Sequence, residues 1–216
     1  MAKFVFRNQK TPGIMYYEIE DELGNVSTLQ LKQRVAEEQI EPPKEGELAP
    51  LFYLRNEEGL PVTSLTAAAS DNESRSVLDL VHFKPLVLSF YCNCWGSYAP
   101  KHLEALKALA PKVDALGGQL LILTNESQKE IGRIARKLET ELPIYHDKNY
   151  NVARSYGVFS ETSPIWDRIA GISDEVFTPS LFVLGRDRRI GYAFVDENFD
   201  NAPDAKTILK AIYDGR

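Results

Sequence analysis

The chain of 216 residues is 44% hydrophobic and 26% charged, which is the composition of an ordinary soluble globular protein. Its net charge of −6 comes from acidic and basic residues mixed along the chain, so no basic patch indicates a nucleic-acid partner. The N-terminus lacks the apolar run of a secretory signal, and the apolar runs are too short to span a bilayer, so we expect a cytoplasmic protein without a membrane partner.

The first part of the chain predicts a small β-rich appendage. Residues 14–31 (IMYYEIEDELGNVSTLQL) place two β-rich segments around a Leu-Gly-Asn turn, a pattern typical of a hairpin. Residues 31–40 are compatible with a short helix, or with the end of the second strand and a polar linker. The stretch EPPKEGELAP that follows contains three prolines and marks a boundary. We therefore predict an appendage over 1–46 and a larger domain over 47–216.

The larger domain alternates between strand and helix patterns. In chain order, the predicted elements are two short strands within 51–65, a buried strand at 86–91, a helix from about 97 to 116, a strand at 119–125, a helix at 128–138, a strand at 143–147, a helix at 149–157, two strands at 179–185 and 190–196, and a helix at 208–213. Alternation implies parallel strands with crossover helices, and the late hairpin adds antiparallel edges. The fold class is α/β, a three-layer sandwich with a mixed central sheet.

Both cysteines of the chain lie in the stretch FYCNCWGSYAP, which spans residues 90–100. Cys92 and Cys94 follow a central buried strand and precede a long helix. Open α/β sheets place their sites at the carboxyl ends of strands, and the positive end of a helix lowers the pKa of a nearby thiol. The two thiols are therefore candidate nucleophiles.

The spacing of the two cysteines sets a geometric condition on a disulfide. Residues two apart in an extended strand are separated by roughly 6.6 Å, close to the upper limit of roughly 6.8 Å between the Cα atoms of a disulfide. A bond between Cys92 and Cys94 therefore requires a bend at Asn93, a residue type that tolerates unusual backbone angles. We expect the small ring to be strained, and a strained disulfide is readily reduced.

These features together resemble the peroxiredoxin-like branch of the thioredoxin fold, the alkyl hydroperoxide reductase/thiol-specific antioxidant superfamily. The strand ending in Phe90-Tyr91, with Trp95 ahead of a long helix, is similar to the region around that family's site. The segments GELAPLFYLRNEEGLPVTSL and TPSLFVLGRDRRIGYAFVD resemble its opening and closing hairpins. The likeness covers about residues 46–213 and implies a thioredoxin-like domain.

The resemblance also implies substrate contacts around the cysteines. Trp95 is expected to cover one side and to lower the local polarity. Thr178-Pro179 opens a late strand, and Pro179, if cis as in thioredoxin-like proteins, faces the site and leaves a backbone edge for an extended disulfide substrate. We therefore predict Cys94 and Cys92 as catalytic residues and Trp95, Thr178 and Pro179 as substrate-binding residues, with no cofactor and no metal.

Three parts of the family's peroxide pocket are missing. The position of the peroxidatic cysteine is Ala99, followed by Pro100, and the activating threonine is replaced by Gly96. The arginine that steadies the thiolate falls near Pro179. Alanine cannot supply a thiolate, so thiol chemistry rests on the cysteine pair alone.

Three interpretations of the pair stay open. In the first, the protein is a thiol–disulfide oxidoreductase or a peroxidase-like antioxidant protein whose partner is a protein disulfide or a small thiol or peroxide. Cys94, closer to the helix, attacks a disulfide or a peroxide, and Cys92 resolves the intermediate. In the second, it is a catalytically inactive scaffold that binds proteins or forms a homodimer. In the third, Cys92, Cys94 and His102 carry copper or zinc.

Overall fold

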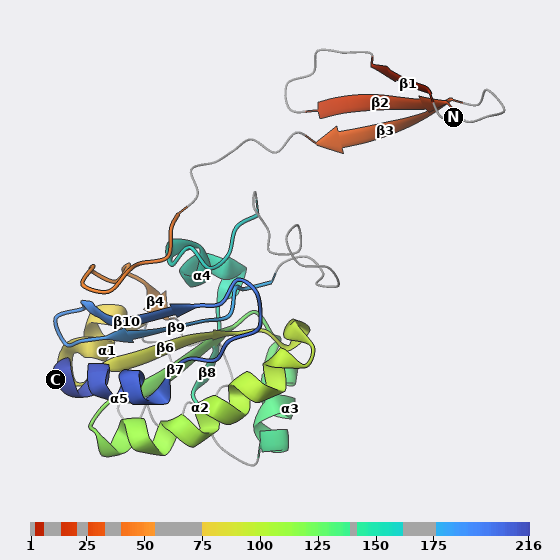
Figure 1. Ribbon diagram of the computed structural model, residues 1–216. Coiled ribbons are helices and arrows are strands. Elements are labelled where there is room, and N and C mark those ends of the chain that lie inside the picture. The colour runs from red at the N-terminus through yellow and green to blue at the C-terminus, as the bar shows by residue number, and fades with distance from the viewer. Residues whose placement is uncertain are drawn as a thin grey trace. The chain divides into compact units, whose positions relative to one another are not determined.

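The computed structural model describes residues 3–6, 14–20, 26–32, 40–54, 75–138, 142–161 and 176–216 (Figure 1). Contacts between Cα atoms divide the chain into two compact units, Met1–Gln39 and Ile40–Arg216. By its contacts the stretch 40–46 belongs to the second unit, whereas the sequence places it with the appendage. No helix in these described ranges is long and apolar enough to cross a membrane.

The first unit is a three-stranded antiparallel sheet in the order β1-β2-β3. Its strands are β1 (Lys3–Phe6), β2 (Ile14–Glu20) and β3 (Val26–Lys32). The pairing of β2 with β3 runs over their full lengths and confirms the predicted hairpin, whose turn lies outside the described residues. Strand β1 was not predicted from the sequence. The start of the segment 31–40 continues β3, and residues 33–39 also lie outside the described ranges.

The second unit is built around a five-stranded sheet in the order β10-β9-β6-β7-β8. Its strands are β6 (Leu86–Tyr91), β7 (Gln119–Thr124), β8 (Ile144–His146), β9 (Ser180–Leu184) and β10 (Ile190–Val195). Strands β6, β7 and β8 are parallel, β9 is antiparallel to β6, and β10 is antiparallel to β9. The mixed sheet of the predicted thioredoxin-like fold is confirmed.

Helices and short elements complete this unit. They are β4 (Tyr53–Leu54), β5 (Arg75–Ser76), α1 (Val77–Phe83), the 3-10 turn η1 (Asn93–Trp95), α2 (Tyr98–Ala115), α3 (Gln128–Leu138), the 3-10 turn η2 (Lys148–Tyr150), α4 (Asn151–Ser155) and α5 (Ala205–Asp214). From β6 onward their order is the predicted one. Helix α1, which begins with a capping box between Ser76 and Asp79, was not predicted from the sequence. Only the first strand of the predicted opening hairpin falls on described residues, as β4; its second strand falls within residues 55–74, outside the described ranges. Strand β4 instead pairs with β5, which was not predicted.

Alternation along β6 separates the two faces of the sheet. Ser89 contacts His102 of α2, whereas the neighbouring Phe90 packs against Tyr156, which follows α4. Helix α5 contacts α2, β9 and β10 and so shares the α2 face (Figure 1). Helices therefore cover both faces, and every residue of β6 is buried, as its apolar run predicts.

Two glycines that follow helices differ in how closely the rest of the chain packs against them. Gly117, after α2, and Gly157, after α4, both have positive φ, of 74° and 64°. A Cβ at Gly157 would lie 2.3 Å from the carbonyl oxygen of Ile40, whereas a Cβ at Gly117 has no described atom within 4 Å. Gly157→Ala therefore adds a backbone clash to the conformational strain that both substitutions share.

We expect Gly117→Ala to lower the free energy of unfolding by about 1–2 kcal/mol, the usual cost of a left-handed alanine. Gly157→Ala should cost at least about 2 kcal/mol more, because the chain at 40–42 must move. Urea unfolding of both variants measures the difference. Equal losses of unfolding free energy in the two variants would show that the stretch 40–42 can move without a measurable cost.

Candidate active site

The cysteines lie immediately beyond β6, at the carboxyl edge of the parallel strands. The turn η1 begins at Asn93, and the Cα atoms of Cys92 and Cys94 are 5.2 Å apart. The two sulfurs form a disulfide, and the backbone N–H of Cys94 points at the Cys92 sulfur over 3.3 Å. The bend at Asn93 that a disulfide requires is therefore present.

The two sulfur-bearing residues differ in exposure. Cys92 is 2% exposed and belongs to the hydrophobic core, whereas Cys94 is exposed. A nucleophile arriving from solvent therefore reaches Cys94 and not Cys92. Helix α2 begins shortly afterwards at Tyr98, and Ser97 makes no side-chain hydrogen bond that caps it.

A carboxylate that the sequence analysis did not single out lies beside the buried sulfur. Glu126 follows β7, and its Oε1 accepts a hydrogen bond of 2.9 Å from the backbone N–H of Asn93. The same oxygen is 3.9 Å from the sulfur of Cys92. The signal for this residue was its position just after a buried strand parallel to β6, because the carboxyl ends of such strands meet at one edge.

Glu126 is held in place by its neighbours along this edge. The register pairs Tyr91 with Thr124 and Thr124 with His146, so the three parallel strands end in one row. The backbone N–H of Glu126 donates to Thr124 Oγ1 at 3.2 Å. Nδ1 of His146 is 2.9 Å from the carbonyl oxygen of Glu126, and because a carbonyl only accepts, this nitrogen carries the proton.

Trp95 lies in the core beneath the cysteines. It is 4% exposed, and its Nε1 donates a hydrogen bond of 2.9 Å to the carbonyl oxygen of Phe177. Its ring makes edge contacts with four other rings, those of Tyr91, Tyr98, His102 and Phe199. Trp95 therefore ties η1 to the segment that leads into β9, and its contact with substrate stays a prediction.

Thr178 and Pro179 lie beside the cysteine pair, because Ser180 pairs with the residue before the last one of β6. No described peptide bond is cis, so the bond before Pro179 is trans and the condition of a cis proline is not met. The N–H of Thr178 donates to Val158, and the carbonyl of Pro179 accepts from Asp196. Since proline has no N–H, this segment has no free backbone donor for an extended chain. The substrate-binding role of the two residues stays a prediction.

His102, the third ligand in the metal-carrier interpretation, points into the core. It is 3% exposed, and its Nε2 lies 2.9 Å from Ser89 Oγ, which is also 3.2 Å from the carbonyl oxygen of Ser180. Burial lowers the pKa of His102 to about 4. Across the part of the chain that the structure describes, no three His, Cys, Asp or Glu side chains gather as a metal site would require.

The residue that the resemblance places at the family's peroxidatic position is part of the packed core. Ala99, in the first turn of α2, is 1% exposed, and the residue in place of the activating threonine, Gly96, is exposed and has a positive φ. Neither residue offers a nucleophile or a hydroxyl. Thiol chemistry at this edge of the sheet therefore depends on the cysteine pair, with Glu126 beside it.

Comparisons with known proteins agree with this architecture. The AhpC/TSA family profile matches residues 47–193. The fold is similar to peroxidoxin BcpB from Mycobacterium tuberculosis, with a TM-score of 0.57 and 17% identity, over 81% of this chain and 99% of that chain. It is also similar to a putative thiol:disulfide interchange protein DsbE from Chlorobium tepidum (TM-score 0.52, 16% identity, 79% and 99% covered) and to Mycobacterium tuberculosis AhpC (0.56, 13%, 79% and 92%). A search of curated proteins finds no match.

The buried imidazole of His102 makes stability depend on pH. Its folded-state pKa of about 4 lies below the usual value of 6.5, so the unfolded chain binds a proton first as the pH falls. The contribution of the neutral His102 to the free energy of unfolding is complete above pH 6.5. It is lost as the pH approaches 4, which lowers the free energy of unfolding by up to about 3 kcal/mol. His102→Gln should flatten the dependence, measured by urea unfolding across this range. Parallel pH profiles for both proteins would contradict the assignment.

Glu126→Gln keeps an oxygen that can accept from Asn93 but removes the negative charge beside Cys92. In the reduced protein, a carboxylate this close disfavours a thiolate at Cys92. We expect the substitution to speed alkylation of Cys92 at neutral pH by about tenfold, because the thiolate is the form that reacts. Peptide mass spectrometry separates Cys92 from Cys94, and Glu104→Gln, on the exposed face of α2, serves as the control. An unchanged rate at Cys92 would count against the electrostatic role.

Proposed function

The chain belongs to the AhpC/TSA family, and we propose that it is a thiol–disulfide oxidoreductase acting through the pair Cys92 and Cys94. The observation that carries the proposal is the disulfide at the carboxyl edge of β6, with one residue exposed and the other buried. Because Ala99 stands at the family's peroxidatic position, the chemistry of this chain depends on that pair.

The exposed Cys94 is the residue that a substrate thiolate attacks in the oxidised protein. The bond between the two protein sulfurs breaks, its electron pair passes to Cys92, and a mixed disulfide joins Cys94 to the substrate. A second substrate thiolate then attacks the substrate sulfur of this bond and releases Cys94. The substrate leaves as a disulfide, and the protein has gained two electrons and, after protonation of both thiolates, two protons.

The opposite direction uses the same groups. Reduced Cys94 attacks a substrate disulfide, and Cys92 then displaces the substrate thiolate by closing the protein disulfide. Glu126 makes the two cysteines unequal as attacking and resolving residues, because a negative charge on the buried sulfur of Cys92 is unfavourable beside a carboxylate. Cys92 is therefore suited to resolving an intermediate and Cys94 to starting one.

A peroxide is the second candidate substrate, and family membership favours it. Cys94 would attack the peroxide oxygen to form a sulfenic acid and release an alcohol or water, and Cys92 would then condense with it, releasing water and forming the disulfide. Because position 96 has no hydroxyl and position 179 no arginine, we favour a disulfide over a peroxide as the substrate.

The roles of the two cysteines are separated by single substitutions. Cys92→Ser should accumulate a mixed disulfide at Cys94 when incubated with glutathione disulfide, because the resolving thiol is gone. Cys94→Ser should react more slowly, by at least about tenfold, a rate difference equivalent to about 1.4 kcal/mol in the barrier, because its remaining thiol is buried. Intact-protein mass spectrometry follows both reactions.

The double variant Cys92→Ser/Cys94→Ser is the control for background exchange. Full thiol–disulfide or peroxide-consuming activity in that variant would remove the pair from the mechanism. A wild-type protein without turnover, whose partner binding survives both substitutions, would instead support the scaffold interpretation.

A further inference from the structure

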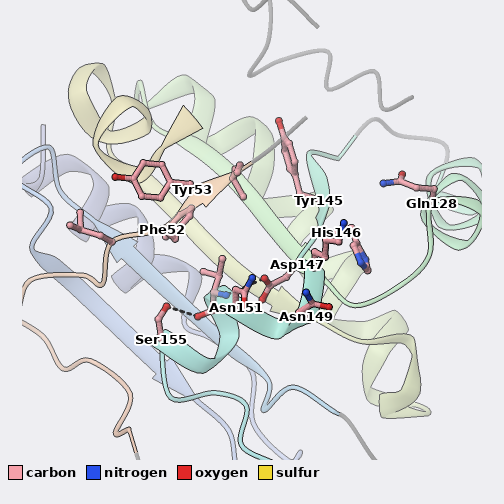
Figure 2. A pocket seen from close by; sticks show the side chains of 13 residues that line it. Phe52, Tyr53, Gln128, Tyr145, His146, Asp147, Asn149, Asn151 and Ser155 are labelled. Atoms are coloured by element: carbon pink, nitrogen blue, oxygen red, sulfur yellow. Dashed lines mark hydrogen bonds between the residues drawn. The ribbon is translucent and has the colours of Figure 1, made fainter. Parts of the chain in front are cut away.

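A cavity of about 540 Å³ opens beyond the end of β8, at the same edge of the sheet as the cysteine pair. Its described lining comes from the β4 segment, the start of α3, the end of β8 and the region of η2 and α4. Figure 2 shows Phe52 and Tyr53 on one side, His146 and Gln128 on the other, and Asn149 and Asn151 between them. None of the chemistry proposed above uses this cavity.

The lining combines aromatic rings with carboxamides. The rings are those of Phe52, Tyr53 and Tyr145, and the carboxamides are those of Gln128, Asn149 and Asn151. Carboxamides both donate and accept hydrogen bonds, which matches the peptide group, and aromatic rings match apolar side chains. This combination suits a segment of polypeptide.

The charges in the lining do not select a strongly charged ligand. Lys148 is its cation, and the carboxylate of Asp147 accepts hydrogen bonds from the backbone N–H groups of Val152 and Ala153. Asp147 is thereby engaged in starting α4. The lining therefore favours recognition by shape and amide groups over recognition by charge.

The register of the three parallel strands sets the scale of the separation between the end of β6 and the cavity. Tyr91, Thr124 and His146 form one row across three adjacent strands, so Tyr91 and His146 are two strand spacings apart, or about 10 Å. Cys92 follows the first member of the row, and the cavity begins at the last. An extended polypeptide covers about 10 Å in three residues.

The β9 side of the cysteine pair has few groups that could bind an extended chain. The N–H of Thr178 is bonded to Val158, Pro179 has no N–H, and Trp95 is buried beneath the turn. Recognition along β9 therefore lacks donors. The β8 side has a cavity, three carboxamides and exposed aromatic surface, with Tyr53 67% exposed.

We propose that the substrate is a polypeptide whose cysteine reacts at Cys94 while an apolar side chain three residues away binds in the cavity beyond β8. The proposal rests on the thiol–disulfide activity proposed above and adds the substrate class to it. A small disulfide is too short to occupy both places. The cavity therefore distinguishes polypeptide disulfides from small ones.

The experiment uses the reduced full-length protein and synthetic peptides that carry one cysteine as its mixed disulfide with 2-nitro-5-thiobenzoate. Each reaction oxidises the protein dithiol to its disulfide and releases the peptide thiol and the coloured thiolate. Two peptides place phenylalanine three residues before or three residues after the cysteine, and a third has glycine at both places. We expect at least one phenylalanine peptide to react about tenfold faster than the glycine peptide.

Two tyrosine variants test whether the preference for a phenylalanine peptide arises in the cavity. Tyr53→Ala should abolish it, whereas Tyr213→Ala, which removes a 62% exposed ring of α5 outside the cavity, should retain it. The mixed disulfide of free cysteine should react equally with all three proteins. Equal rates for the phenylalanine and glycine peptides, or a preference that survives Tyr53→Ala, would overturn the inference. No reaction with even the free-cysteine probe would overturn the proposed function, and this inference with it.

Discussion

The hydrogen bond from the backbone N–H of Asn93 to Glu126 is the interaction on which the candidate site depends. It joins the ends of two parallel strands and fixes the turn that brings the Cα atoms of Cys92 and Cys94 to 5.2 Å. An extended chain would hold them roughly 6.6 Å apart, near the limit for a disulfide. The same turn leaves Cys94 in solvent and Cys92 in the core, so one bond accounts for both the closure of the disulfide and the difference between its sulfurs.

The scaffold was largely predictable because its signals are local. The buried strand LVLSFY, the glycines after α2 and the polar turn between β9 and β10 each act through a few neighbouring residues. Ser89, the single polar residue of that strand, is explained by His102, a partner on the following helix. Helix α1 was missed although its capping box is local, because a helix of seven residues has too short an apolar pattern to stand out.

The site was predictable only in part because its remaining members depend on strand order. The cysteine pair is visible in the sequence as a motif, but Glu126 becomes part of the site only once β7 is known to lie beside β6. Trp95 was expected to cover one side of the cysteines, but its burial depends on an acceptor at Phe177, which lets a tryptophan lie in the core without leaving its N–H unpaired. These facts follow from tertiary pairing, which no short stretch of the sequence encodes.

The position of the thiols changes what controls them. At the family's peroxidatic position, inside the first turn of α2, a thiolate would face the helix N-terminus directly, but that position is a buried alanine here. Beyond β6, the Cys92 sulfur instead lies 3.9 Å from the carboxylate of Glu126, just after the end of β7. Positive charge stabilises a thiolate, as capture of a small peroxide needs, whereas negative charge favours its protonation or its return to a disulfide. A pair governed by Glu126 is therefore better matched to exchanging disulfides than to holding a persistent thiolate.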